Sequence, residues 1–492
     1  MGERAETAFG ARLRELAALD PRRPSLSCGE VTFSRAEVVE RVGRLAARLA
    51  ARGVTPGSMV TIGLPNSTEF VEAMLAAWWV GATPQPISDR LPAIERRAIL
   101  DLADPSLAIG VGPDDAGGRP TLSADELRTV AATPSGGRAP EPVLGPLFKA
   151  TTSGGSTGRP KLIVATQPAE ATGLGAFGAL LAMRDNGSVL VTGPLAHNAP
   201  FSVTIVGLLL GNHIVVMPRF DATETLRLVE RHRIDWLYLV PTMMLRIWRL
   251  PEEERTKFDV SSLRIAYHMA APCPPWLKQA WIDWLGPDVI MELYGGTELQ
   301  ALTIVTGREW LERPGTVGRA VVGEIEGRDE AGRPLPPGEV GELWMRRGPG
   351  EPSPYRYVGA TPKSAGDGWE SLGDMGKLDA DGYVYLSDRL TDMILVGGAN
   401  VYPGEIEAAL DEHPAVRSSC VIGLPHEDLG SVPHALVELA EPVDDAELLD
   451  HLRARLAPYK LPRSIERVAE PLRDDAGKVR RSALRAARLA GS

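Results

Sequence analysis

The segment Thr151–Lys161 reads Thr-Thr-Ser-Gly-Gly-Ser-Thr-Gly-Arg-Pro-Lys, with three glycines, five hydroxyl side chains and a closing lysine. Glycine reaches backbone conformations that other residues avoid, so such a segment can turn several N–H groups toward one anion. The pattern is typical of a nucleotide phosphate loop, but also of a flexible Gly/Ser linker. It lacks the adjacent Gly-Lys pair of the common P-loop, because Arg159 and Pro160 separate Gly158 from Lys161. Taken alone, the segment leaves both interpretations open.

Apolar segments of strand length alternate with amphipathic segments on both sides of this loop. The expected strands are Val31–Phe33, Met59–Leu64, Leu107–Val111, Ser188–Thr192, Ile214–Met217, Trp236–Val240, Leu263–Tyr267 and Val289–Leu293. The expected helices are Ser67–Val80, Thr223–His232, Trp276–Trp284 and one that begins at Ser34, with Glu37 completing a capping box, and stops near Gly53. The alternation predicts βαβ units and a mainly parallel sheet. Pro113–Pro142, rich in Gly, Pro, Asp and Ser, is expected to be a long surface connection.

The pattern changes twice toward the C-terminus. Gly315–Asp381 has many Gly and Pro turns around short strands and predicts a β-rich subdomain, with strands at Glu342–Met345 and, just beyond it, Tyr383–Leu386. Expected strands Val416–Gly423 and Ala435–Glu438 then alternate with expected helices Gly404–Glu412 and Asp445–Leu456. We therefore expect an α/β fold, with an N-terminal domain over residues 1–388 and a small α+β domain over residues 389–492.

Composition and charge exclude several classes of protein. The 492 residues carry a net charge of −11 without long basic runs, which argues against a nucleic-acid partner. The three cysteines lie far apart and the eight histidines show no paired spacing, so we expect structural thiols, a reducing compartment and no structural zinc. The longest apolar stretch, Phe201–Met217, is interrupted by polar residues and is short for a membrane span. With no signal-peptide pattern, a cytoplasmic protein is expected.

Five further segments follow the glycine-rich loop: Pro194–Phe201, Tyr294–Glu298, Ser371–Gly376, Asp388–Glu407 and Gly477–Arg481. In this order, from about Ser34 to Leu484, the chain resembles the adenylate-forming superfamily of acyl- and aryl-CoA synthetases, adenylation domains and luciferases. Each segment alone is weak. Asp374 taken singly is more typical of a turn, His197 of a structural histidine and Lys478 of a solvated charge. Their joint order and spacing carry the resemblance.

The resemblance implies two half-reactions. A carboxylate is a poor electrophile, because it is anionic and has no good leaving group. Its attack on the α-phosphate of ATP gives an acyl-adenylate and pyrophosphate, after which a thiol displaces AMP. Both steps need phosphate charge neutralised and the reactants held in line, rather than a covalent enzyme nucleophile. The implied cofactors are ATP, Mg²⁺ and coenzyme A.

The resemblance also implies roles for matching residues. The residues that would bind the β- and γ-phosphates are Thr152, Ser153, Gly154, Gly155, Ser156, Thr157, Gly158 and Lys161. Those that would bind adenosine are Ala270, Ala271, Pro272, Tyr294 and Gly295, with Asp374 and Arg389 at the ribose. Thr297 would contact the α-phosphate, and Glu298 would hold Mg²⁺. Lys478 would bridge the incoming carboxylate and the α-phosphate, with His197 near the carboxylate.

The C-terminal domain of this superfamily rotates between the half-reactions. Asp388 matches the hinge, and Gly397 and Gly398 would line the thiol channel in the second orientation. The chain departs from the usual pattern at Leu162, at Leu372 and in Gly154-Gly155-Ser156. These departures concern closure of the phosphate loop more than the reaction.

The expected acid pocket contains His197, Asn198, Phe201, Tyr238, Val240, Met269, Cys273 and Gly296. No acidic residue in Pro194–Leu210 could pair with a substrate amine, and a buried unpaired ammonium is costly, so an α-amino acid is disfavoured. The apolar pocket predicts a bulky, apolar or ring-containing acid.

We therefore expect an AMP-forming acid–CoA ligase, monomeric or homodimeric. One alternative is an adenylating enzyme that loads an acyl carrier protein. Transfer of the acyl group to an amine and luciferase-like oxygen chemistry are less favoured. The alternative from a different class is a non-catalytic nucleotide-binding scaffold.

Overall fold

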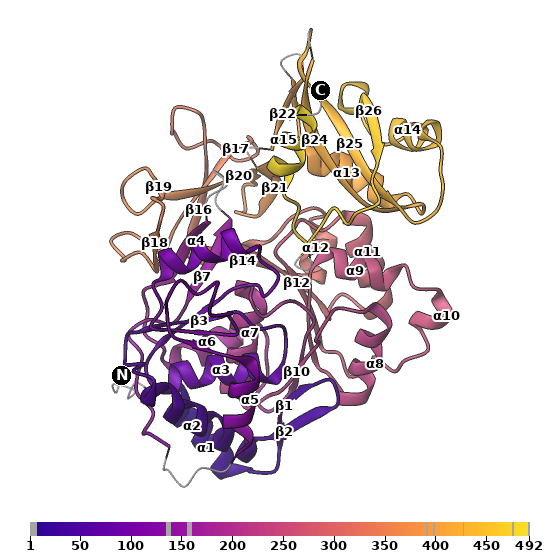
Figure 1. Ribbon diagram of the computed structural model, residues 1–492. Coiled ribbons are helices and arrows are strands. Elements are labelled where there is room, and N and C mark those ends of the chain that lie inside the picture. Colours follow the sequence, from indigo (N-terminus) through magenta and orange to yellow (C-terminus); the bar gives the residue numbers. More distant parts are fainter. Residues whose placement is uncertain are drawn as a thin grey trace.

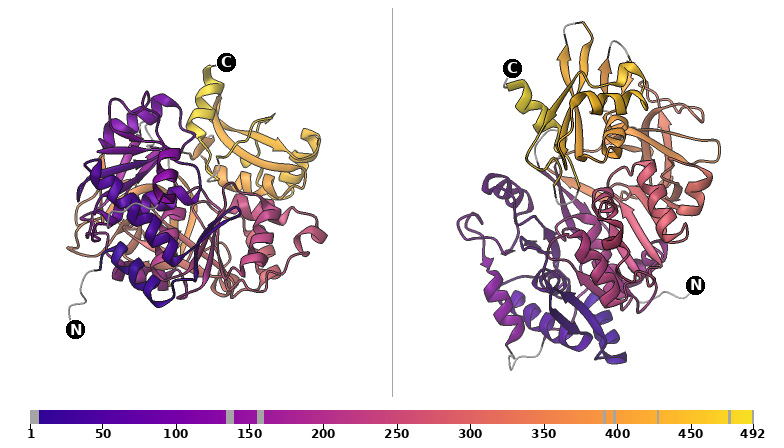
Figure 2. Two further views of the ribbon diagram at one scale, coloured as in Figure 1. Left: turned by 60° about the horizontal axis from the view of Figure 1, so that its bottom comes forward. Right: turned by 90° about the vertical axis from the view of Figure 1, so that its right-hand side faces the viewer.

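The computed structural model describes residues 7–133, 139–154, 160–389, 392–396, 399–426, 428–474 and 477–490, with the backbone alone at 153, 154, 388 and 389. A large part, formed by the described residues up to 389, carries a smaller C-terminal part at one end (Figures 1 and 2). Sheets and helices alternate through both parts, which confirms the expected α/β class.

The largest sheet runs through the large part. Its strands are β1 (Pro24–Cys28), β2 (Val31–Ser34), β9 (Ser188–Val191), β10 (His213–Val216), β11 (Trp236–Leu239), β12 (Ile265–Met269), β13 (Ile290–Gly295), β14 (Leu302–Thr306) and β15 (Arg319–Val322). Their order is β15-β14-β13-β12-β11-β9-β10-β1-β2. The six neighbouring strands β13, β12, β11, β9, β10 and β1 run parallel. At the two edges, β2 pairs antiparallel with β1, β14 with β13, and β15 with β14. The carboxyl ends of the parallel strands therefore meet at one edge, the usual place for a ligand in such sheets.

Helices cover this sheet and its neighbour. They are α1 (Phe9–Leu19), α2 (Arg35–Ala51), α3 (Thr68–Trp79), α4 (Ala93–Ala103), α5 (Ala124–Ala132), α6 (Ala171–Leu180), α7 (Asn198–Leu209), α8 (Ala222–His232), α9 (Pro241–Trp248), α10 (Glu252–Arg255), α11 (Pro275–Leu285) and α12 (Gly307–Glu312). The capping box of Ser34 and Glu37 is confirmed at the start of α2. Its apolar stripe, including Val38, Val42 and Leu45, is buried, which is how an amphipathic helix gains most of its stability.

A second parallel sheet corrects one expectation. It consists of β3 (Met59–Ile62), β4 (Thr83–Pro86), β5 (Leu107–Ile109) and β6 (Thr121–Leu122). The surface connection expected over Pro113–Pro142 is wrong, because this segment contains β6 and α5, whose Leu127 and Ala131 are buried. The Ser123 side chain caps α5 by accepting from the Glu126 N–H, a Ser-x-x-Glu signal present in the sequence. The helix is too short for a strong periodic pattern, so tertiary packing stabilises it.

The glycine-rich loop joins the two strands of a hairpin. β7 (Ala150–Gly154) and β8 (Pro160–Ala165) pair antiparallel, and β18 (Tyr355–Val358) adds to β8. Ser153 pairs with Lys161 and Gly154 with Pro160, so both ends of the loop are fixed by strand pairing. This arrangement favours the loop interpretation over the linker.

The expected β-rich subdomain contains β16 (Glu324–Arg328), β17 (Gly341–Arg346), β19 (Lys363–Ser364), β20 (Glu370–Leu378) and β21 (Val384–Arg389). The order is β16-β17-β20-β19, and β21 pairs with β20, where Asp374 lies opposite Arg389 and Met375 opposite Asp388. The boundary expected after Asp388 thus falls at the end of β21.

The C-terminal part has its own core. Its elements are β22 (Ile394–Val396), β23 (Ala399–Val401), α13 (Pro403–Glu412), β24 (Val416–His426), β25 (Gly430–Leu439), α14 (Asp445–Arg453), a 3₁₀ turn (Pro458–Lys460), β26 (Ser464–Arg467) and α15 (Arg481–Ala490). Ile406, Leu410 and Leu448 are fully buried within it. Arg249 of the large part donates to the Asp411 carbonyl at 2.8 Å, which joins the two parts.

The long apolar stretch Phe201–Met217 is divided between α7 and β10, both largely buried. Across the ranges described, none of the helices combines the length and the apolar character that a membrane span requires.

Candidate active site

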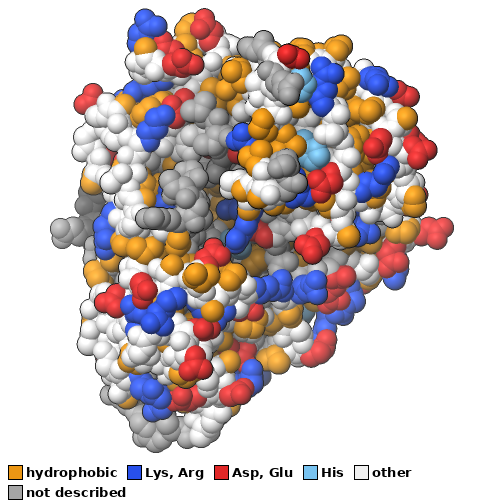
Figure 3. Space-filling model, turned by 45° about the horizontal axis from the view of Figure 1, so that its top comes forward, with side chains coloured by type: hydrophobic (Ala, Val, Ile, Leu, Met, Phe, Trp, Pro, Cys, Tyr) orange, Lys and Arg blue, Asp and Glu red, His pale blue; other side chains and the backbone are white. Residues whose placement is uncertain are grey.

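A cleft of about 2680 Å³ lies between the C-terminal part and the carboxyl ends of β9, β11, β12 and β13. Its volume exceeds the roughly 300–1,000 Å³ of a single small-molecule pocket, so it can hold several reactants together. Figure 3 shows the molecule hollowed below the C-terminal part, with Lys and Arg side chains beside the hollow. The parallel sheet explains why the residues that line the cleft lie together, because the loops after these strands converge on one edge of the sheet.

Most site residues expected from the sequence line this cleft. They are Thr152, Lys161, His197, Asn198, Tyr238, Met269, Ala270, Ala271, Pro272, Cys273, Tyr294, Gly295, Gly296, Thr297, Glu298, Asp374 and Lys478. Phe201 is 0% exposed and packs against the Trp78 ring at 5.4 Å between centroids, Val240 is 1% exposed, and neither lines the cleft. Both apolar side chains belong to the core beneath the pocket.

Other expected site residues fall outside what the structure describes. They are Gly155, Ser156, Thr157, Gly158, Gly397 and Gly398, together with the side chains of Ser153, Asp388 and Arg389; Gly154 is described by its backbone at the end of β7.

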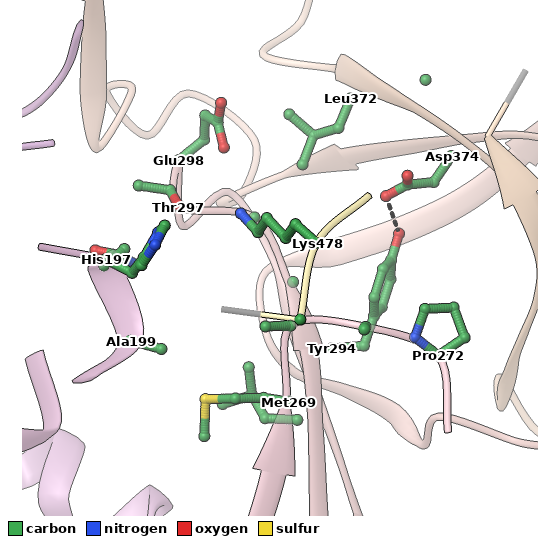
Figure 4. Close-up of a pocket in the computed structure, with 18 of the residues that line it drawn as sticks. His197, Ala199, Met269, Pro272, Tyr294, Thr297, Glu298, Leu372, Asp374 and Lys478 are labelled. Atoms are coloured by element: carbon green, nitrogen blue, oxygen red, sulfur yellow. Dashed lines mark hydrogen bonds between the residues drawn. The ribbon is translucent and has the colours of Figure 1, made fainter. Parts of the chain in front are cut away.

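One end of the cleft places an aspartate against a tyrosine. Tyr294 Oη, at the end of β13, donates to Asp374 Oδ2 at 2.9 Å (Figure 4). Pro272 lies beside Tyr294, in the segment after β12. That segment begins at Ala270 with φ at 75°, a left-handed conformation that is unusual without glycine and is often found at functional sites. This end offers a carboxylate, an aromatic face and exposed backbone.

Glu298 is held by a tyrosine that the sequence analysis missed. Tyr357 Oη, on β18, donates to Glu298 Oε1 at 2.6 Å, and Lys161 Nζ lies 3.8 Å from the same oxygen. Lys161 Nζ also lies 3.8 Å from the centroid of the Tyr357 ring, a cation–π arrangement. Burial, followed by the charge of Glu298, raises the pKa of Tyr357 above its usual range, so the phenol keeps its proton and donates.

The donor set around Glu298 fits a magnesium ion better than a structural metal. Glu298 is 6% exposed, and its Oε2 accepts no hydrogen bond from any described residue. Within the described ranges, no group of three His, Cys, Asp or Glu side chains could hold a metal. A single carboxylate oxygen is what Mg²⁺ uses when phosphates and waters supply its other ligands.

Lys478 reaches the same cleft from the C-terminal part. Its side chain extends toward Thr297 and Glu298 (Figure 4). Gly477, with φ at 76°, makes the preceding turn, and a Cβ there would lie 2.7 Å from Thr242 Oγ1 on α9. Asp474 fixes the turn by accepting from the Lys478 N–H at 2.9 Å. Glycine is therefore required both by the backbone conformation and by the close approach.

Lys149, two residues before the glycine-rich stretch, is a second cleft residue that the sequence analysis missed. Its side chain is 2% exposed and lines the cleft, and its Nζ donates to Asn198 Oδ1 and Ser202 Oγ on α7. The signal was available, because Lys149 interrupts an otherwise apolar run, Leu147-Phe148-Lys149-Ala150.

The cysteines agree with the expectation of structural thiols. Burial raises the pKa of Cys28 to about 11 and that of Cys420 to about 12, and it raises the pKa of Cys273 further. The thiols therefore stay protonated at neutral pH and are poor nucleophiles.

Family models and relatives agree with this geometry. Residues 13–351 match the model described as AMP-binding enzyme, and residues 405–478 match that of the AMP-binding enzyme C-terminal domain. The chain is 32% identical over 461 residues to a feruloyl-CoA synthase from an Amycolatopsis species, covering 92% of this chain and 93% of the relative. It is 30% identical over 502 residues to 3-[(3aS,4S,7aS)-7a-methyl-1,5-dioxo-octahydro-1H-inden-4-yl]propanoyl:CoA ligase from Rhodococcus jostii, covering 93% and 94%.

A solved structure covers nearly the whole chain. The o-succinylbenzoate CoA synthetase of Bacillus subtilis, in complex with its acyl-adenylate intermediate, matches with a TM-score of 0.82 and 26% identity over 98% of both chains. The same enzyme in complex with ATP and a magnesium ion matches with a TM-score of 0.80, 26% identity and coverage of 96% and 98%. The chain therefore belongs to the AMP-binding enzyme family and is an adenylate-forming enzyme of the acyl- and aryl-CoA ligase type.

Proposed function

We propose that this enzyme activates a bulky, ring-containing carboxylic acid as its acyl-adenylate and then transfers the acyl group to coenzyme A. The observation that carries the proposal is the meeting of Lys478 from the C-terminal part with Thr297 and Glu298 of the large part in one cleft (Figure 4). Neither part alone contains this combination of groups.

ATP would bind with its adenosine at the Asp374 end of the cleft. Adenine would lie between Tyr294 and the backbone of residues 270–272, with Gly295 beside it. Asp374 would accept hydrogen bonds from the ribose hydroxyls, oriented by the bond that Tyr294 Oη donates at 2.9 Å. Arg389, opposite Asp374 in the β20–β21 pair, would assist at the ribose.

The β- and γ-phosphates would bind in the glycine-rich loop between β7 and β8, formed by residues 152–158 with Lys161. Thr297 would contact the α-phosphate. Glu298, held by Tyr357, would be the protein ligand of Mg²⁺, whose charge would offset that of the phosphates.

In the adenylation step, a carboxylate oxygen of the acid would attack the α-phosphorus while the bond to the bridging oxygen of pyrophosphate breaks. Lys478 would lie between the two anions, reduce their repulsion and stabilise the charge of the transition state. His197, which directly precedes α7, would bound the carboxylate site. The protein supplies position and charge here, and no covalent intermediate on a side chain is required.

In the second step, the thiol of coenzyme A would attack the acyl carbon and release AMP. The C-terminal part would rotate about Asp388, withdraw Lys478 and present Gly397 and Gly398 to the pantetheine. The named relatives are CoA ligases and synthetases, which favours coenzyme A over an acyl carrier protein as acceptor.

The acid pocket would be formed by His197, Asn198, Tyr238, Met269, Cys273 and Gly296, with Phe201 and Val240 behind it. The acids in the names of the three relatives are ring-containing, which supports the class. We further propose a cytoplasmic monomer or homodimer.

The proposal is tested by incubating the enzyme with ATP, Mg²⁺, CoA and a panel of ring-containing, straight-chain and amino acids. Pyrophosphate release and acyl-CoA, measured by mass spectrometry, should depend on a ring-containing acid. ATP binding without pyrophosphate release for any acid would favour the scaffold alternative, and an acyl-adenylate that CoA does not discharge would favour another acceptor.

A further inference from the structure

Lys149 occupies a position that the adenylation chemistry does not explain. It directly precedes β7, and its Nζ crosses to the first turns of α7, where it donates to Asn198 Oδ1 and to Ser202 Oγ at 2.6 Å. Ser202 Oγ in turn donates to the Asn198 carbonyl at 2.7 Å. Both partners of the ammonium are therefore neutral oxygens.

The ammonium has no counter-ion in the described part of the chain. No carboxylate forms an ion pair with Lys149, and burial alone lowers its pKa to about 7. The titratable residue nearest in sequence to the α7 partners of Lys149 is His197, which directly precedes Asn198. A buried ammonium without an anion is costly, which is why burial lowers the pKa of Lys149. When protonated, Lys149 has three N–H donors for the two acceptors on α7, so a ligand oxygen that accepts the third would also stabilise the charged form.

An aromatic ring also lies close to the Lys149 ammonium. Its Nζ lies 4.9 Å from the centroid of the Phe148 ring. Leu174 and Phe177 of α6, with Ala199 and Val203 of α7, line the same cleft, and so does Gln167. A few polar groups among apolar side chains are how small-molecule sites fix the orientation of a ligand.

We propose that Lys149 is a specificity-determining residue, whose ammonium binds a second oxygen of the acid substrate, separate from the carboxylate held near Thr297 and Lys478. This inference rests on the proposed function. The substrate class is then a ring-containing acid that also carries a carbonyl, hydroxyl or carboxylate oxygen. Asn198, whose Oδ1 accepts from Lys149, would present its amide N–H groups beside the same oxygen.

Two other roles make different predictions. If Lys149 only bridges β7 and α7, then losing the bridge affects all acids equally, and Ser202→Ala does the same to a smaller extent. If Lys149 holds the reacting carboxylate, its removal again reduces turnover of every acid. A change in the ratio between acids distinguishes the proposal from both.

The experiment compares the parent enzyme, Lys149→Met and Ser202→Ala on matched ring-containing acids. One acid of each set carries a remote carboxylate, one a remote ketone or hydroxyl, and one a methyl group at the same place. We expect the parent to prefer an oxygenated acid, and Lys149→Met to lower kcat/KM for it at least tenfold while changing the methyl acid by less than threefold. The arm with the larger loss identifies the oxygen that Lys149 binds.

A uniform loss across the three acids, or an unchanged ratio, overturns the proposal. A second measurement separates this result from a failure of the proposed function. Each acid is added without ATP, and its binding is measured as the shift that it causes in the melting temperature of the enzyme. Acid binding that loses its preference for the oxygenated acid in Lys149→Met supports Lys149 even where no pyrophosphate is released. Lys149→Gln replaces Lys149→Met if the methionine variant does not fold.

Discussion

Replacing Gly477 with alanine should impair adenylation through a contact that the proposed rotation of the C-terminal part would remove in the other half-reaction. Gly477 has φ at 76°, and its Cα faces α9, where an added Cβ would lie 2.7 Å from Thr242 Oγ1. The turn that contains Gly477 presents Lys478 to the cleft. The added methyl group should therefore push Lys478 away from the α-phosphate.

The magnitude has two contributions. The left-handed backbone costs an alanine about 1–2 kcal/mol in either orientation of the C-terminal part. The contact with Thr242 costs about 1–3 kcal/mol, the usual range for overpacking, and exists where Gly477 lies against α9. At about 1.4 kcal/mol per factor of ten, the second contribution lowers the adenylation rate by roughly 5- to 150-fold relative to thioester formation.

The assay measures the two half-reactions separately. Pyrophosphate release from acid and ATP reports adenylation, and acyl-CoA formed from a supplied acyl-adenylate reports the thiol step. Gly430→Ala is a matched control, since Gly430 has φ at 74° in the same part of the chain and its added Cβ would meet no atom closer than 3.9 Å. We expect this control to lower stability without changing the ratio of the two rates.

A second substitution tests the contact itself. In the double variant Gly477→Ala with Thr242→Ala, the adenylation rate should fall less than the two single effects together predict, because the atom at 2.7 Å from the added Cβ is removed. Equal losses in both half-reactions for Gly477→Ala, without recovery in the double variant, would refute the role of this close approach.

Three further predictions follow from the site. Lys478→Ala should lower adenylation more than about 100-fold while acyl-CoA still forms from a supplied acyl-adenylate, and retained pyrophosphate release would contradict the role of this lysine. Tyr357→Phe removes the 2.6 Å bond to Glu298, worth about 1.5–3 kcal/mol for a charged acceptor, and should raise the Mg²⁺ concentration needed for half-maximal rate about tenfold; an unchanged Mg²⁺ titration would contradict it. The folded-state pKa of Lys149 is about 7 against 10.5 for the free side chain, so between these values the unfolded chain binds a proton that the folded chain does not. The unfolding free energy of the parent should therefore rise relative to that of Lys149→Met by about 1.4 kcal/mol per pH unit between pH 8 and 9, and denaturant titrations that show a constant difference would contradict this.

The fold was predictable where the chain is periodic or forms a short apolar run of strand length. The strands β9 to β13 are short apolar runs, so their positions were predicted within a few residues, and Ser34 with Glu37 marked the start of α2. Helix α7 was missed because it lacks such a pattern. Nine of its residues are buried, among them Phe201 and Ile205, so it carries no polar face from which a helical period could be recognised.

The site was predictable where a motif follows a strand. Tyr294 lies at the end of β13, Thr297 and Glu298 follow directly after the strand, and the structure brings all three into the cleft. Tyr357 lies 59 residues from Glu298 and reaches it because β18 pairs with β8, a long-range pairing that no local pattern encodes. Lys149 is 49 residues from Asn198, and its burial is likewise a property of the tertiary structure.

Three of the lysines that line the cleft differ in what holds them, and these differences separate their roles. Lys149 is buried against neutral oxygens, Lys161 lies against Glu298 and Tyr357, and Lys478 is exposed on a turn of the C-terminal part. In the proposed cycle, Lys478 leaves the cleft between the two half-reactions with its exposed turn, whereas Lys149, proposed to select the acid, stays fixed in the large part. It follows that a variant such as Gly477→Ala should slow every acid by the same factor, while Lys149→Met should change their ratio. A Gly477→Ala enzyme with altered preference among acids would show that selection and catalysis are not divided between the two parts.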